Sequence, residues 1–237
     1  MPASDLLDRA VDDPSEPLSV HLLELRQRLI WCLGYFAAGM ALCYGWSGSL
    51  LSWLARGAGG VVFTYPTEAF MMRLKVAAWA GFLAALPLIL HQAWLFVARA
   101  MNPGFRRLSL FLVPASYFLF LAGAAAAIFF VVPTAMRFLL AFGSEEVRPL
   151  MTLSGYLDFM SGLALSFGGV FQVPVALFVL NRAGWVTRRG LANRRRYVYL
   201  LTIVAAAILT PGPDVFSQAA LAVPAVVIFE LTLLALD

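Results

Sequence analysis

The chain has 237 residues, of which 62% are hydrophobic and 13% charged, and its mean hydropathy is +0.84. This composition is too apolar for a water-soluble globular protein of this length, so it indicates a protein that resides in a lipid bilayer. The net charge of +4 comes from basic residues in short segments between apolar stretches. No soluble domain large enough to house an enzyme is therefore expected on either side of the membrane.

Residues 1–17 are acidic and contain three prolines, and they lack the short apolar core and small-residue cleavage site of a signal peptide. We therefore expect a disordered cytoplasmic tail over 1–17, followed by a single transmembrane domain over 18–237. Cys32 and Cys43 would lie about 16 Å apart along one helix, too far for a disulfide, and we interpret them as packing or lipid-facing residues.

Six apolar stretches have lengths near those needed to cross a bilayer. They lie at about 28–47, 69–97, 108–133, 156–181, 198–211 and 215–235. The fifth is short, and Pro211, Gly212 and Pro213 end it sharply, so the last two spans are expected to reach only part of the way across. The sequence predicts an all-α, polytopic membrane protein with six transmembrane helices, the last two short.

The basic residues predict the orientation of these spans, because loops rich in Arg and Lys stay in the cytoplasm. Twelve of the 17 basic residues precede the first span or lie in the second-to-third and fourth-to-fifth loops, namely Arg9, Arg26, Arg28, Arg99, Arg106, Arg107, Arg182, Arg188, Arg189, Arg194, Arg195 and Arg196. Both termini are therefore expected in the cytoplasm. The other five, Arg56, Arg73, Lys75, Arg137 and Arg148, belong to the outer side. There the apolar segments 48–68 and 134–155 are expected to lie as surface caps.

Motifs for metal or nucleotide chemistry are absent from the sequence. No cluster of His, Cys, Asp and Glu has the spacing of metal ligands, and no Gly-rich loop opens a helix as phosphate sites require. We expect no cofactor and no metal. The basic run RRGLANRRR lies in a short loop between spans, and we interpret it as a topology signal that contacts anionic lipid rather than nucleic acid.

Polar residues inside the spans are candidates for function or for helix packing. Gln172 precedes Pro174 by two residues, and two interpretations stay open for it. Its amide could bond a backbone carbonyl that the proline leaves without a partner, or it could face a substrate cavity. Further prolines lie in or at the ends of spans and predict kinked helices and a curved bundle: Pro87, Pro114, Pro133 and Pro224.

The stretch HLLELRQRL, residues 21–29, carries charge directly before the first span. Leucines at helical spacing form one apolar stripe: Leu18, Leu22, Leu25 and Leu29. His21, Glu24 and Arg28 share another face, and Arg26 points elsewhere. One interpretation is an interfacial helix with a Glu24–Arg28 pair worth a few tenths of a kcal/mol. The other is that the helix reads a substrate.

Six motifs in order, on a matching six-span hydropathy profile, resemble the TatC family, the multispanning receptor subunit of the twin-arginine protein translocase. They are HLLELRQRL (21–29), YPTEAF with RLK (65–75), LPLILHQAWLFVA (86–98), FGGVFQVPVAL (167–177), LTPGPDVFSQ (209–218) and AVPAVVIFE (222–230). The resemblance covers Leu18 to about Leu234. It implies a glove-like bundle that binds twin-arginine signal peptides on its concave face, for export driven by the proton-motive force.

By this resemblance, Glu24 and Arg26 match the family's amino-terminal recognition pair, and Phe96 matches the aromatic at the end of the second span. Two further positions of that site depart from the family pattern. Phe105 stands where a glutamate is usual in the second-to-third loop, and Gln172 stands where the family usually has Glu. Both departures remove a carboxylate from the concave face, where guanidinium groups would be bound.

The resemblance also implies an outer cap and turn and a surface for single-span partners of the TatA and TatB type. The cap and turn residues are Pro66, Thr67, Glu68, Phe70 and Asp214, and Glu230 matches an acid in the last helix. Partner helices are expected on the fifth and sixth spans, at Leu201, Leu209, Thr210, Phe216, Ser217 and Gln218. Membrane lipids and further copies of the chain within a receptor complex complete the expected partners.

Two other functions stay open at this stage. A small-solute transporter is the competing class, but such proteins tend to show internal repeats and several ionisable groups near the midplane of the membrane. The sequence has no internal repeat, and Asp158 and Glu230 lie near span ends. A diverged copy with weakened signal-peptide binding is the second alternative, which the two missing acids favour.

Overall fold

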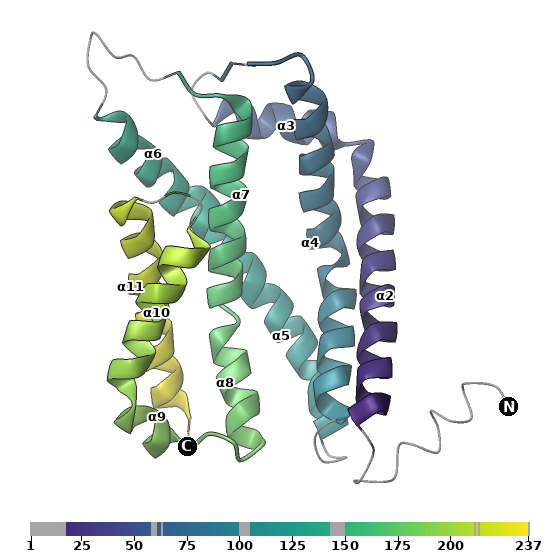
Figure 1. Cartoon of the computed structure of the whole chain (residues 1–237), viewed down its shortest axis with the longest axis vertical. Coiled ribbons are helices and arrows are strands. Elements are labelled where there is room, and N and C mark those ends of the chain that lie inside the picture. The colour runs from purple at the N-terminus through teal and green to yellow at the C-terminus, as the bar shows by residue number, and fades with distance from the viewer. Residues whose placement is uncertain are drawn as a thin grey trace, which may run out of the picture. The chain divides into compact units, whose positions relative to one another are not determined.

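The computed structural model describes residues 18–57, 61–62, 64–99, 105–142, 150–210, 212 and 214–236, without the side chains of 18–21, 99 and 105–109. The expected tail over 1–17 lies outside these residues. The helices are α2 (Leu18–Tyr44), α3 (Ser47–Arg56), α4 (Glu68–Arg99), α5 (Phe105–Ala126), α6 (Val132–Leu140), α7 (Leu153–Val170), α8 (Val173–Arg182), α9 (Arg188–Asn193), α10 (Arg195–Leu209) and α11 (Val215–Ala235), with a π-helical turn η1 (Ala127–Val131) (Figure 1). The all-α prediction is confirmed.

Four segments of the described chain are long and apolar enough to cross a bilayer: Glu68–Ala98, Leu110–Leu140, Leu153–Arg182 and Val215–Ala235. A fifth is added if α2 and α3 form one bent span. The fifth predicted span corresponds to α10, which has only 15 residues. Such a helix is about 22 Å long, less than the roughly 30 Å of a bilayer core. The short helix is therefore present, and the count of six spans stays a prediction.

Prolines shape the spans in different ways. The fourth predicted span is two helices, because Pro174 leaves α7 to end at Val170 and α8 to begin at Val173. The third continues to Leu140, past its predicted end at 133, through the π-helical turn that precedes Pro133. The helices α4, α5 and α11 contain Pro87, Pro114 and Pro224 in their interiors. The curved, glove-like bundle stays a prediction.

The chain forms two compact units, of which the first comprises residues 1–45 and 77–114. Here α2 and α4 pack with their backbones in close contact, since a side chain at Gly39 would lie 2.6 Å from the carbonyl oxygen of Gly81. Arg28 lies eleven residues before Gly39 on α2, and Gln92 lies eleven residues after Gly81 on α4. The side chains of Arg28 and Gln92 are hydrogen-bonded to each other. These two contacts fix an antiparallel pair and its register.

The second unit comprises residues 46–76 and 115–237. Its core includes α7, where Leu157, Leu163 and Phe167 are at most 2% exposed. Close approach of helices relies on small residues, as is usual in membranes. A side chain at Gly123 of α5, for example, would lie 2.6 Å from the carbonyl oxygen of Phe167.

Within this second unit, α10 and α11 form a hairpin beside α7. Ser166 of α7 donates to the carbonyl of Leu209 at 2.7 Å, which satisfies a carbonyl at the end of α10. Figure 1 shows that the C-terminus and α9 lie at the same end of this unit, and that the hairpin reaches less far than α7 toward the opposite end. The sequence predicted two short helices here. The helix α10 is short, with 15 residues, whereas α11 has 21 residues and is long enough to cross a bilayer.

Candidate functional site

Glu24, the acid of the 21–29 helix, is buried at 8% exposure and paired with an arginine one turn later. Nε and Nη2 of Arg28 both lie 2.6 Å from Oε1 of Glu24. Nη1 of Arg28 donates to Oε1 of Gln92 at 2.9 Å and to the backbone carbonyl of the same residue at 3.3 Å. The predicted intrahelical pair is therefore present, and a residue of α4 extends it.

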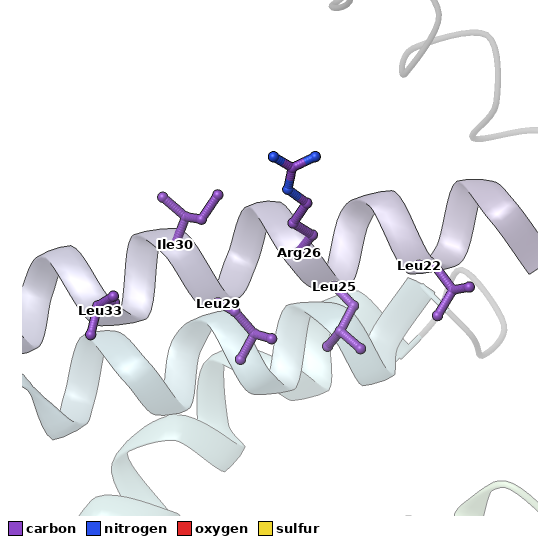
Figure 2. A pocket seen from close by; sticks show the side chains of 6 residues that line it. All are labelled: Leu22, Leu25, Arg26, Leu29, Ile30 and Leu33. Carbon is purple, nitrogen blue, oxygen red and sulfur yellow. The ribbon is translucent and has the colours of Figure 1, made fainter.

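Arg26 lies on a different face of α2, as the sequence predicted. It is exposed, and in Figure 2 it points away from the side that Leu25 and Leu29 occupy. Leu29 is 60% exposed in this unit, which is the normal state of a lipid-facing side chain. A shallow, open hollow on α2 is lined by Leu22, Leu25, Arg26, Leu29, Ile30 and Leu33. Charge and apolar surface thus alternate around this stretch of helix.

Phe96 is partly buried one turn after Gln92 on α4. Glu24 lies one turn before Arg28 on α2, so the antiparallel register places Glu24 and Phe96 at the same level of the helix pair. Phe105 is the first residue of α5, and its side chain lies outside the described residues. The structure thus gathers Glu24, Arg26 and Phe96 in one unit.

Gln172 belongs to the second unit, in the turn between α7 and α8. Its Nε2 donates to the carbonyl of Ser116 on α5 at 2.9 Å. The amide therefore satisfies a backbone carbonyl, as one interpretation expected, but the carbonyl lies on another helix and not one turn away from Pro174. A hydrogen bond between helices is a common use of such a residue in membranes.

Glu68 joins the two segments that the sequence predicted as outer caps. Its Oε2 accepts from the backbone nitrogen of Thr64 at 2.6 Å, and its Oε1 accepts from that of Ser154 at 2.8 Å. Thr152 caps α7 beside it, and Val62 forms a bridge with Thr152. The carboxylate thus lies at the N-terminus of α7, where negative charge is favourable.

The other cap residues lie around this carboxylate on the exposed side. Pro66 and Thr67 form the turn before α4, and the carbonyl of Thr67 accepts from Met71 at 3.0 Å. Phe70 is 53% exposed. Pro66, Thr67 and Phe70 are therefore exposed on the surface of this unit, whereas Glu68 is buried and forms the hydrogen bonds that join the two segments.

Asp214 and the predicted docking residues lie around the tip of the hairpin. Asp214 caps α11 by accepting from the backbone nitrogen of Ser217 at 2.6 Å. Gln218 donates to the carbonyl of Ile203 across the hairpin at 3.3 Å, and Phe216 stacks on Phe138 of α6 with ring centroids 4.8 Å apart. Thr210 is the C-cap residue of α10. These residues hold the tip together from within.

After its first turn, which carries Arg195 and Arg196, α10 exposes an apolar surface, with Leu201 68% and Leu209 48% exposed. Side chains of this kind face lipid or another helix in a membrane. The two predicted leucines therefore lie where a partner could reach them.

Further polar contacts between helices were not predicted from the sequence. Lys75 of α4 pairs with Asp158 of α7, and Glu230 of α11 accepts from both Arg195 and Tyr199 of α10. The bond from Arg28 to Gln92 is another such contact. A signal for it was available, because His91 and Gln92 are adjacent polar residues in an otherwise apolar span.

A protein-family model described as Sec-independent protein translocase protein (TatC) matches residues 20–224. The chain belongs to the TatC family. A Sec-independent protein translocase protein TatC from Carboxydothermus hydrogenoformans is 34% identical, over 94% of this chain and 93% of its own length. Its counterpart from Magnetococcus marinus is 36% identical, over 92% of this chain and 82% of its own length.

The fold is also similar to a crystal structure of the twin arginine translocase receptor TatC. The TM-score is 0.80 at 30% sequence identity, and the match covers 92% of this chain and 99% of the other. Sequence and structure thus agree on the TatC family.

Proposed function

We propose that this chain is the receptor and core subunit of a twin-arginine translocation system, which binds the twin-arginine signal peptides of folded precursor proteins for export driven by the proton-motive force. The observation that carries the proposal is the family match over residues 20–224, together with the similarity to a twin arginine translocase receptor. A protein of this family is a translocase component and not an enzyme. The comparisons favour neither a solute transporter nor a diverged copy.

The first unit offers chemistry suited to such a peptide. Glu24 supplies a carboxylate, the group that binds guanidinium most selectively, and Phe96 lies at its level of the helix pair. Arg26 is exposed on a different face of α2. The proposed signal-peptide site comprises these three residues with Phe105 and Gln172.

Partner proteins of the TatA and TatB type, each with a single span, would dock on α10 and α11. The exposed leucines of α10 support this placement. A 15-residue helix is shorter than the bilayer core, and packing against a longer helix is one way to relieve this mismatch. Contacts with lipid and with further copies of the chain would complete the complex, and no nucleic acid takes part.

The protein would lie in the inner membrane of the cell as a multi-pass protein with both termini in the cytoplasm. Arginines on either side of α9 support this orientation, since they lie at the end of the second unit that also holds the C-terminus. Glu68 and the cap around it would then face the outer side.

The test is a pull-down of the full chain with a twin-arginine precursor and with the same precursor carrying two lysines. A receptor retains the arginine form and loses most of the lysine form, because lysine cannot form the planar paired bonds of a guanidinium. Equal capture of both precursors, or of neither, would contradict the proposal.

A further inference from the structure

The guanidinium of Arg28 donates hydrogen bonds to two residues on different helices, Glu24 on α2 and Gln92 on α4. Its Nε and Nη2 bond to Glu24 within α2, and its Nη1 bonds to the side chain and the backbone carbonyl of Gln92 on α4. Both side chains of the ion pair are largely buried, at 13% and 10% exposure for Arg28 and Glu24. The Glu24 carboxylate therefore already carries a cation.

An incoming guanidinium cannot simply add to this arrangement. Two guanidinium groups on one partly buried carboxylate repel each other, and a cation that is pushed off without a new partner loses its hydrogen bonds while still shielded from water. Binding at Glu24 is therefore favourable only if Arg28 has another acceptor within reach.

Gln92 supplies that acceptor, because its two oxygens already contact Arg28 from the side opposite Glu24. We propose that Gln92 is a positioning residue, which receives Arg28 when Glu24 takes up an arginine of the signal peptide. This inference rests on the proposed receptor function. It adds an exchange in which one arginine replaces another on the same carboxylate.

The neutral amide of Gln92 is suited to this role because it binds the guanidinium of Arg28 less strongly than a carboxylate would and more strongly than an apolar side chain would. A carboxylate at position 92 would hold Arg28 more firmly than the amide does, and an apolar side chain would leave only the backbone carbonyl of residue 92 as an acceptor. With an amide, Arg28 rests on Glu24 until a group of equal geometry displaces it. A lysine ammonium, which has no planar fork, is a poorer substitute and leaves Arg28 in place.

The experiment measures the dissociation constant of a twin-arginine peptide for the full chain in detergent. Gln92→Met removes the side-chain acceptor at nearly constant size and leaves only the weaker 3.3 Å backbone contact, so it should weaken binding by about tenfold, whereas Gln92→Glu should strengthen it. Both effects should vanish in an Arg28→Gln background, since no cation then needs a new partner. Gln27→Met, at an exposed position on α2, is the matched control and should change nothing.

The outcomes separate this inference from the receptor function. If the wild type binds the twin-arginine peptide no better than a twin-lysine peptide, the receptor function itself fails. If the wild type discriminates but the Gln92 effects persist unchanged with Arg28→Gln, then residue 92 acts by packing or by direct contact, and the exchange is wrong. Should Arg28→Gln fold poorly, Arg28→Lys serves in the same cycle, where a single-point donor should shrink both Gln92 effects; undiminished effects would overturn the exchange.

Discussion

At the scale of single residues, Glu24 combines burial with a compensated charge. Replacing it by Gln keeps the shape but removes the charge-assisted bond, so we expect twin-arginine peptide binding to weaken by about tenfold or more. Insertion into the membrane should be unaffected, because Leu22, Leu25 and Leu29 remain on the helix surface. Peptide titration and membrane fractionation measure the two effects separately.

Arg26→Ala should also weaken binding, but through its own exposed guanidinium, since Arg28 and not Arg26 holds Glu24 in place. Unchanged peptide binding in both Glu24→Gln and Arg26→Ala would reduce this stretch to an interfacial anchor. The charges of residues 21–29 would then serve the membrane surface alone.

Phe105 and Gln172 give a second prediction, because each stands where a carboxylate is usual in the family. Phe105→Glu should strengthen peptide binding more than Gln172→Glu does. The amide of Gln172 donates to the carbonyl of Ser116, and a carboxylate there would oppose that oxygen and tend to take up a proton.

Titrations at low and high salt test this prediction. The gain from Phe105→Glu should shrink as salt rises, since charges exposed to water are screened over about 10 Å at 0.1 M. No gain at low salt would place Phe105 outside the arginine site. A larger gain from Gln172→Glu would show instead that the turn between α7 and α8 contacts the peptide.

At the scale of elements, α10 combines a short length with an apolar, exposed flank. Cysteines at Leu201 and Leu209 should form crosslinks with a cysteine in a single-span partner of the TatA or TatB type. Phe118 and Phe130, which are 66% and 73% exposed on the third span, provide control positions of similar exposure. Crosslinks at the controls but not on α10 would move the partner surface to the third span.

At the scale of the whole molecule, the arginine distribution predicts the orientation of the chain. A reporter enzyme that is active only in the cytoplasm should be active when fused after Asp237, and one that is active only outside the cytoplasm should be inactive there. The reason is that the arginine-rich loop from Arg182 to Arg196 resists translocation. A reporter in the cap, after Gly57, should give the opposite result. An outward C-terminus would contradict both the orientation and the receptor proposal.

Hydropathy predicted the helices well where length and apolar character were the deciding quantities. The last span was expected at 215–235 and is observed as Val215–Ala235. The division of the fourth span and the extension of the third past Pro133 were missed, because both depend on local hydrogen bonding around a proline.

The partners of polar side chains could not be predicted from the sequence. Gln172 bonds to a residue 56 positions away, and Arg28 bonds to one 64 positions away. Such pairs are set by the register between packed helices, and a hydropathy profile contains no information about register. The resemblance marked Glu24 as a candidate site residue, and helical spacing predicted its pair with Arg28. Only the structure revealed that Gln92 also bonds to that arginine.

The close backbone contact between Gly39 and Gly81 can serve as a pivot for a change in the angle between α2 and α4. No side chain separates the two backbones at that contact, because both residues are glycines. Arg28 and Gln92 lie about 16 Å from this contact along their helices. A change of about 5° in the angle between the helices would therefore shift the two residues relative to each other by about 1.4 Å. That displacement is enough to break the 2.9 Å bond between them. Because helices adapt to bilayer thickness in part by tilting, a change in membrane thickness would act on the hydrogen bond between Arg28 and Gln92.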